Sequence, residues 1–476
     1  MKQLLLFVLC AACGTLSAQP WVDTTYQIQS EFDVTYGTAT TFAGYEDTLK
    51  LDVSYPIDDV PPGCGRPLMV IVHGGGWFAG DKNEGYPKRL RQDFAKRGYV
   101  TASVNYRLGQ FHTDRDINCN VDGWNCFNMT DSSEFYRANH RGVQDVNGAI
   151  RYLINNAGQY QIAPSNVFVV GESAGGFVAM GVGFIDDESE VLTDLVAAYP
   201  DAPKPNVRYE NTCIRRYELA ESIDSMDLSR PALGSYSGDL NLPLIQDYEV
   251  RGVGNIYGGV FNNILKTHKT SAPALYMYHQ PCDLVVPIGH TRLLSGFVNC
   301  FLGFPFNCGY IINRPLTYGS LGVKRLIDTM EVRGVSTTEY FYDQSSNNFN
   351  CIQQADPNLG CHALDRYWFR MTNMATYFAS QMGACIPDGV RGAEWRGRIV
   401  KSAFPNPVND ELTLTLNQEY NLVRVRIFSM LGVEMASTEI YRQSEVKINL
   451  SALPPGAYAG VVSGKFGSEV VSFVKR

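Results

Sequence analysis

The sequence predicts an α/β fold with a mostly parallel central sheet, followed by a small all-β C-terminal sandwich. Between about residues 45 and 382, short apolar runs rich in β-branched residues alternate with segments of helical periodicity. These runs are apolar on both faces, which is typical of strands buried inside a parallel sheet. From residue 399 onward the chain shows short alternating segments separated by turn residues, the pattern of a small antiparallel domain.

The elements of the first domain are expected from their residue patterns. Residues 48–56 (TLKLDVSYP) alternate as a half-buried strand does. Further strand candidates lie, in chain order, at 67–75, 99–107, 166–173, 194–200, 272–280 and 337–344. Apolar residues at helical spacing indicate two helices, one at 137–157 and one at 322–334.

Two regions interrupt this alternation. Residues 108–133 are polar and irregular, and residues 201–271 form a long excursion rich in Gly, Pro and Tyr. Long insertions in a compact domain are usually functional lids or binding loops. We therefore expect 201–271 to be either a lid over the site or a stabilising excursion with no role in substrate binding.

One polar stretch, DRDINCN (114–120), has the spacing of a calcium loop. Asp114, Asp116 and Asn118 occupy ligand positions, but Cys119 stands where such a loop needs Gly and no Glu closes it. We expect a solvated turn there and no metal site.

The N-terminus predicts export. Lys2 precedes a short apolar run, and Leu16-Ser17-Ala18 forms a small-residue cleavage site. The run is too short to span a bilayer, which takes roughly 20 residues. We interpret residues 1–18 as a cleaved signal peptide and expect no integral membrane segment, so the mature protein is secreted or held at the cell surface.

The composition excludes some partners. The formal net charge is −8, which provides no basic field for nucleic acid or an anionic membrane. Twelve cysteines, less Cys10 and Cys13 of the signal peptide, leave an even ten, which favours disulfides in an exported protein. Close pairs suggest local bridges, namely Cys119 with Cys126, Cys300 with Cys308 and Cys351 with Cys361. The connectivity of the others stays open: Cys64, Cys213, Cys282 and Cys385.

Gly171-Glu172-Ser173-Ala174-Gly175 matches G-x-S-x-G after an apolar strand and before a small-residue helical pattern. In that context the strand must reverse into a helix within one or two residues, and the turn exposes the serine hydroxyl at a helix N-terminus. We predict that Ser173 is a nucleophile.

A serine hydroxyl needs a base and an orienting acid. His362 follows the last strand candidate and begins a helical pattern, so we expect it to be the base. Asp283 lies just beyond the strand 272–280, and the order Ser173, Asp283, His362 is the one associated with this turn. Such chemistry requires no cofactor.

The stretch HGGGW, which begins at His73 directly after the apolar run PLMVIV, supplies the remaining part of the predicted site. Glycines let the backbone approach a reacting carbonyl closely, and backbone N–H groups stabilise the negative charge of a tetrahedral intermediate. We expect the oxyanion hole to consist of the N–H groups of Gly75, Gly76 and Ala174, with His73 and Gly74 supporting the turn. A phosphate loop is excluded because no Lys-Ser/Thr pair follows.

These residues together resemble the α/β-hydrolase superfamily, in particular the carboxylesterase and hormone-sensitive-lipase-like esterases. The resemblance covers about residues 45–382 and rests on VIVHGGGW, VQDVNGAIRYL, GESAGG, CDLVVP and GCH. It implies an eight-stranded sheet, the roles given above for Ser173, Asp283 and His362, and a supporting role for Glu172 behind the nucleophile. Cys282 beside Asp283 and Cys361 beside His362 further suggest disulfides that stiffen the loops of the acid and the base.

The C-terminal segment resembles the type A sorting domain of the type IX secretion system of Bacteroidetes. FPNPVNDELTL, VRIFSMLGVEM and INLSALPPGAYAGVV carry this resemblance, with the basic ending Lys475-Arg476. It implies translocation by that machinery, removal of the domain, and surface attachment or release. A carbohydrate-binding sandwich is the alternative.

The sequence thus predicts a signal peptide (1–18), a catalytic domain (19–383), a linker (384–398) and a sorting domain (399–476). The expected function is hydrolysis of carboxylic esters, small or polymeric. Three alternatives stay open: a serine peptidase with the same triad, an esterase directed at polysaccharides or polyesters, and a non-catalytic adhesion protein.

Overall fold

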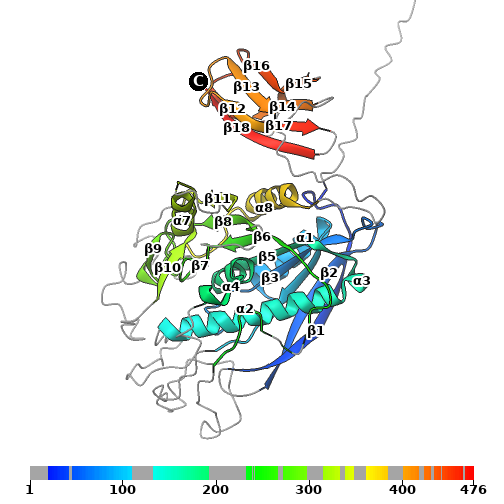
Figure 1. Ribbon diagram of the computed structural model, residues 1–476, viewed down its shortest axis with the longest axis vertical. Coiled ribbons are helices and arrows are strands. Elements are labelled where there is room, and N and C mark those ends of the chain that lie inside the picture. The colour runs from blue at the N-terminus through cyan, green and yellow to red at the C-terminus, as the bar shows by residue number, and fades with distance from the viewer. Residues whose placement is uncertain are drawn as a thin grey trace, which may run out of the picture. The chain divides into compact units, whose positions relative to one another are not determined.

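A computed structural model describes the chain in segments. They are residues 20–41, 46–109, 132–191, 232–265 apart from 239 and 241, 272–296, 315–332, 338–347, 361–383, 400–416, 423–429, 434–440, 442–464 and 467–476. The signal peptide, the stretch 114–120, the strand candidate 194–200 and the whole linker 384–398 lie outside them. The chain divides into two compact units, Met1–Pro387 and Asp388–Arg476 (Figure 1).

The first unit is built around an eight-stranded sheet with the order β1-β2-β4-β3-β5-β6-β8-β11. The first two pairings, β1 with β2 and β2 with β4, are antiparallel, and the other five are parallel. The strands are β1 (Ile28–Thr40), β2 (Glu46–Pro56), β3 (Arg66–Val72), β4 (Val100–Val104), β5 (Ile162–Glu172), β6 (Val250–Ile256), β8 (Ala274–His279) and β11 (Tyr340–Gln344). The predicted α/β fold with a mostly parallel sheet is confirmed.

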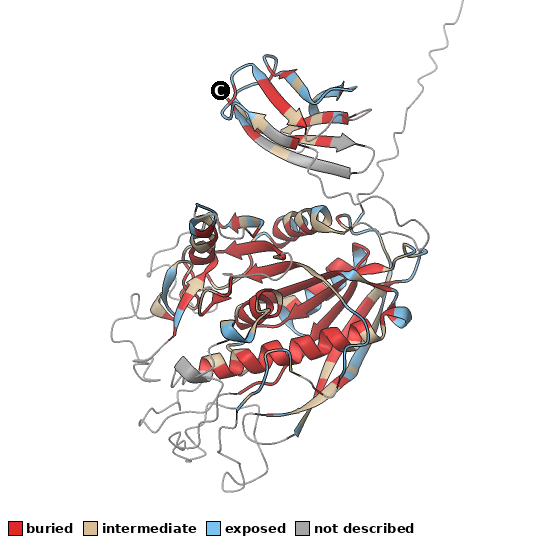
Figure 2. Cartoon of the chain, in the orientation of Figure 1, coloured by how far each residue is buried: buried red, intermediate tan, exposed pale blue. Residues whose placement is uncertain are grey.

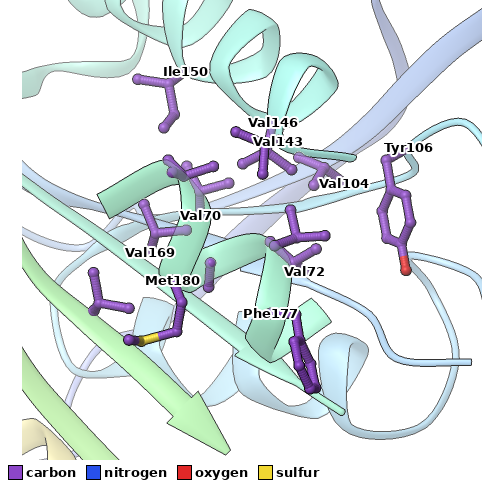
Figure 3. Close-up of a cluster of buried hydrophobic side chains, with 14 of the residues drawn as sticks. Val70, Val72, Val104, Tyr106, Val143, Val146, Ile150, Val169, Phe177 and Met180 are labelled. Atoms are coloured by element: carbon purple, nitrogen blue, oxygen red, sulfur yellow. The ribbon is translucent and has the colours of Figure 1, made fainter. Parts of the chain in front are cut away.

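Helices cover both faces of this sheet. Val70 and Val72 of β3 pack on one face against α2 (Ser132–Asn155) and α4 (Ala174–Phe184). Figure 3 shows side chains of this layer, among them Val70, Val72, Val169, Val143, Val146, Ile150, Phe177 and Met180. Met69 and Ile71, which alternate with those valines, pack on the other face with α1 (Gly85–Lys96) and α8 (Tyr367–Gln381).

The central strands are therefore apolar on both faces, as the runs in the sequence predict. In Figure 2 they are buried along their length, whereas β1, at one edge of the sheet, is partly exposed. The first unit also contains α3 (Ala157–Tyr160), α7 (Ser320–Val332), a short 3-10 turn (Glu188–Glu190) and a small sheet of β7 (Gly259–Val260), β10 (Leu316–Gly319) and β9 (His290–Arg292).

The expectation that residues 201–271 form one excursion is wrong in part. Residues 250–256 are β6, a central strand between β5 and β8. The residues of this segment do not indicate a strand, because Gly252 and Gly254 are poor strand formers. A Cβ at Gly254 would lie 2.9 Å from Val170 Cγ1 and 3.1 Å from Met374 Sδ, so the strand passes too close to its neighbours for a side chain. Edge strand β1 was also not predicted.

The second unit consists of two antiparallel sheets, β12-β13-β16 and β15-β14-β17-β18. Their strands are β12 (Val400–Phe404), β13 (Glu411–Leu416), β14 (Val423–Ser429), β15 (Glu434–Ile440), β16 (Glu445–Asn449), β17 (Gly456–Gly464) and β18 (Gly467–Lys475). Leu412 and Leu414 of one sheet share a core with Val425 and Ile427 of the other. The predicted all-β sandwich is confirmed. In the parts of both units that the structure describes, no helix is long and apolar enough to cross a membrane.

Candidate active site

Ser173 lies at the turn between the end of β5 and the start of α4. Its backbone has φ 51° and ψ −123°, a conformation that is strained for a residue with a side chain. The Ser173 N–H donates to the Ile256 carbonyl at 2.9 Å, which fixes the turn to the end of β6. The strand, turn and helix predicted around this serine are present.

The two glycines of the motif are required by space. A Cβ at Gly171 would lie 1.9 Å from the Gly175 carbonyl oxygen, and one at Gly175 would lie 2.3 Å from the Val72 carbonyl oxygen. Both contacts are with backbone atoms, so no side-chain movement relieves them. The tight turn that exposes Ser173 therefore depends on these two residues.

The structure brings the three predicted residues Ser173, His362 and Asp283 together. His362 Nε2 lies 2.7 Å from Ser173 Oγ, and His362 Nδ1 lies 2.7 Å from Asp283 Oδ2. They come from three places in the chain: the β5–α4 turn, the segment before α8 and the turn after β8. The imidazole is partly exposed, whereas the Asp283 side chain is fully buried.

Asp283 is held in its ionised form. Its Oδ1 accepts the backbone N–H groups of Val285 and Val286 at 2.8 and 3.0 Å. Burial by itself would raise the pKa of Asp283, but the positive charge of His362 and hydrogen bonds from His279 and His362 outweigh it, and the pKa is lowered. A carboxylate with a lowered pKa beside Nδ1 can orient the imidazole and stabilise its protonated form.

The glycine triplet lies against the serine turn. A Cβ at Gly74 would lie 3.0 Å from Ser173 Cβ, so the loop after β3 touches the residue at the turn. Gly75 and Gly76 have φ of +100° and +63°, where glycine is favoured. The His73 ring stacks on Tyr106 at 4.5 Å, and its Nδ1 lies 2.7 Å from the Gly74 carbonyl oxygen, which supports the turn.

Glu172 and Tyr257 form a layer behind the serine and the histidine. Burial raises the pKa of Glu172, and the hydrogen bond that Tyr257 Oη donates to its Oε2 only partly offsets this. The Tyr257 ring meets the His362 ring edge-on at 4.8 Å. Tyr257 was not predicted, because it follows β6; recognition of that strand would have placed it at the same sheet edge as Ser173.

A disulfide joins Cys282 to Cys361. These are the residues immediately before Asp283 and His362, so one covalent link connects the loop of Asp283 to that of His362. The local pair Cys351–Cys361 predicted from sequence is therefore wrong, since proximity in the chain does not determine which cysteines the fold brings together. Cys119, Cys126, Cys300 and Cys308 lie outside the described residues. Among the residues that are described, no group of three His, Cys, Asp or Glu side chains could hold a metal ion.

Comparisons with known proteins agree with this architecture. Residues 51–119 and 135–222 match the family BD-FAE, and residues 402–476 match the secretion system C-terminal sorting domain.

Curated relatives match only shorter segments. A 175-residue segment is 29% identical to Neuroligin-like protein glit-1 of Caenorhabditis elegans, covering 37% of this chain and 19% of that protein. Secreted lipase 5 of Gibberella zeae is 26% identical over 159 residues, 32% of this chain and 27% of that one. Para-nitrobenzyl esterase of Bacillus subtilis is 31% identical over 132 residues, 28% of this chain and 23% of that one. The chain thus spans about a fifth to a quarter of the length of these relatives.

Among solved structures, a truncated form of a carbohydrate esterase from gut microbiota is 16% identical, with 75% of this chain and 98% of that chain covered and a TM-score of 0.37. The strand order, the parallel pairings and the BD-FAE match describe the first part of the chain, and the sorting-domain match describes the second. The chain carries a BD-FAE domain, which is an α/β-hydrolase domain of the esterase type, followed by a C-terminal sorting domain of the type IX secretion system.

Proposed function

We propose that the protein is an exported serine esterase that cleaves carboxylic esters through an acyl-enzyme. The observation that carries the proposal is the continuous chain from Ser173 Oγ through His362 to Asp283, with both hydrogen-bond distances at 2.7 Å. The strained turn at Ser173 and the names of the family and of the matched relatives, which include an esterase and a lipase, support it.

In the first half-reaction, His362 Nε2 takes the proton of Ser173 Oγ as that oxygen attacks the ester carbonyl carbon. The imidazolium that forms is stabilised by the ionised Asp283. When the tetrahedral intermediate collapses, His362 gives the proton to the leaving alkoxide, the alcohol departs, and the acyl group stays on Ser173. Water, deprotonated by His362, then attacks the acyl-serine and releases the acid.

We assign the oxyanion hole to the N–H groups of Gly75, Gly76 and Ala174. Ala174 is the first residue of α4, so its N–H has no acceptor within the helix. The loop of Gly74 to Gly76 lies against the serine turn, which favours its N–H groups as the other donors. Each donor of this kind is worth about 3 kcal/mol in the transition state.

The test is hydrolysis of a short-chain p-nitrophenyl ester by the purified mature chain. Ser173→Ala should lower kcat by roughly 10,000-fold or more, because the covalent route is removed. Ser380→Ala, a change at an exposed serine on α8, is the matched control and should leave kcat unchanged. Equal activity of the wild type and Ser173→Ala would refute the proposal.

Parallel substrates separate the alternatives. A p-nitroanilide with the same acyl group should be cleaved far more slowly than the ester, and faster cleavage of the anilide would make the protein a peptidase. A series of acyl lengths, feruloylated or acetylated polysaccharide and a synthetic polyester then identifies the substrate class.

We further propose that the C-terminal domain directs the chain across the outer membrane and is removed there, which leaves the hydrolase secreted or at the cell surface. The match of residues 402–476 to a secretion sorting domain supports this route.

A further inference from the structure

We propose that His279 is a positioning residue of the site: a neutral, buried imidazole that fixes the Asp283 carboxylate for His362. The inference rests on the proposed roles of Ser173, His362 and Asp283. His279 is the last residue of β8 and its side chain is fully buried, so it acts on the reaction only through its neighbours.

The hydrogen-bond partners of His279 determine its tautomer. Nε2 lies 2.9 Å from the Val286 carbonyl oxygen, which can only accept, so Nε2 carries a hydrogen. Nδ1 faces the backbone N–H of Ser320 at 3.4 Å and the Ser320 hydroxyl at 3.0 Å. The N–H can only donate, so Nδ1 is the acceptor and the ring is the neutral Nε2–H form.

The single hydrogen on Nε2 is directed to the Val286 carbonyl, and the Asp283 carboxylate lies beside it as a second, more distant acceptor. Nε2 lies 3.2 Å from Asp283 Oδ2, the oxygen that also accepts from His362 Nδ1 at 2.7 Å. Two backbone N–H groups on Oδ1 and His362 Nδ1 on Oδ2 donate to the carboxylate alone, whereas Oδ2 shares the His279 Nε2–H with the Val286 carbonyl. The bond from His279 Nε2 to the Val286 carbonyl and the two bonds from the Val285 and Val286 N–H groups to Asp283 Oδ1 tie both side chains to the turn 283–286. Strand β8 and this turn therefore hold the carboxylate plane together.

Loss of the His279 donor would leave Oδ2 with His362 as its partner, while the bonds to Oδ1 remain. The carboxylate could then rotate about the Oδ1 side, and the imidazole would lose its fixed orientation toward Ser173. A role limited to satisfying the buried Val286 carbonyl would instead affect folding stability alone. A positioning role of His279 therefore predicts a change in kcat on substitution, whereas a purely structural role predicts none.

The kinetic test compares His279→Phe with His279→Gln in the full mature chain. Phe preserves the ring volume without donors, and should lower kcat roughly 10- to 100-fold with little change in KM, as expected for losing a hydrogen bond to a charged group. Gln can donate to Asp283 and accept from Ser320, and should restore kcat to within roughly threefold of wild type. Thr317→Val, which removes the buried hydrogen bond from Thr317 Oγ1 to the Thr291 carbonyl on the neighbouring strand, should lower the melting temperature and leave kcat unchanged.

A spectroscopic readout makes the test independent of esterase activity. In protein with nitrogen-15-labelled histidine, NMR should show a neutral Nε2–H ring signal that is lost in His279→Gln and is thereby assigned to His279. The His362 Nδ1–H proton bonded to Asp283 should broaden in His279→Phe. Inactive wild-type protein with these signals would refute the proposed function but keep the inference. Unchanged kcat and an unchanged His362 signal in His279→Phe, or a protonated His279, would overturn it.

Discussion

Glu172, which is partly buried, lies directly before Ser173. Burial raises its pKa above the ordinary value of 4.5, while the bond from Tyr257 and the charge of His362 lower it by less. A group with a raised pKa in the folded state stabilises the fold fully below its ordinary pKa, and this contribution is lost as pH rises through the folded pKa.

Glu172→Gln removes this titration but preserves the side-chain size and an acceptor for Tyr257. We therefore expect the melting temperature of the variant, relative to wild type, to increase as pH rises above about 4.5. Thermal unfolding across the acidic to neutral range measures it. Glu331→Gln, at an exposed position on α7, is the matched control for the loss of one surface carboxylate. Parallel curves for Glu172→Gln and wild type would contradict the burial argument.

The pKa of Asp283 is shifted in the opposite direction from that of Glu172. Its pKa is lowered, so it contributes stability above its ordinary pKa of 3.8 that is lost as pH falls through the folded value. Asp283→Asn should lower kcat about 10,000-fold, because the amide cannot stabilise the imidazolium and favours the wrong tautomer. Its stability deficit relative to wild type should shrink below about pH 4. Activity near that of wild type would show that another group orients His362.

At the scale of elements, the disulfide Cys282–Cys361 closes a loop of the chain between Asp283 and His362, and the two cysteines are 79 residues apart in the sequence. The double variant Cys282→Ala/Cys361→Ala should lower the free energy of unfolding by about 2–4 kcal/mol, because the unfolded chain gains freedom. It should also lower kcat more than it changes KM, since both bridged residues adjoin residues of the site. Denaturant titration and ester kinetics measure the two effects. Unchanged kcat would restrict the bridge to a role in stability.

Strand β6 gives a second test at this scale. Gly254→Ala places a Cβ within 2.9 Å of Val170 and 3.1 Å of Met374, between β5 and α8. The free energy of unfolding should fall by about 1–3 kcal/mol, the usual cost of overpacking a core. Gly158→Ala, where nothing lies within 4 Å in the short helix α3, is the matched control and should not destabilise the protein. Equal effects of the two variants would contradict the close-packing account of β6.

For the whole molecule, each unit has a hydrophobic core of its own, one around the eight-stranded sheet and one between the two C-terminal sheets. Separate cores predict two thermal unfolding transitions. Truncation after Pro387 should remove one transition and leave the kcat/KM for a soluble ester unchanged. Calorimetry and ester kinetics on both forms test this. If the full chain showed a single unfolding transition and the truncated chain showed none, the two units would fold as one.

Much of the first unit could be predicted because its signals are local. Val70 and Val72 alternate with Met69 and Ile71, and all four are apolar, which specifies a strand covered on both faces. Gly252 and Gly254 hide β6 for the opposite reason: their requirement for close packing involves α8, more than a hundred residues away. A strand defined by its neighbours leaves little trace in its own residues.

The candidate site also combines features that the sequence specifies with features that only the tertiary structure specifies. Sequence alone determined the G-x-S-x-G turn, the glycine loop and the order Ser173, Asp283, His362, because sterics at a tight turn and the position of residues after strands depend on neighbours in the chain. Only the tertiary structure decided that Cys361 pairs with Cys282, that Tyr257 packs on His362 and that His279 reaches Asp283. Those contacts join residues that the order of strands in the sheet, or a turn of defined shape, brings together, and spacing along the chain does not specify them.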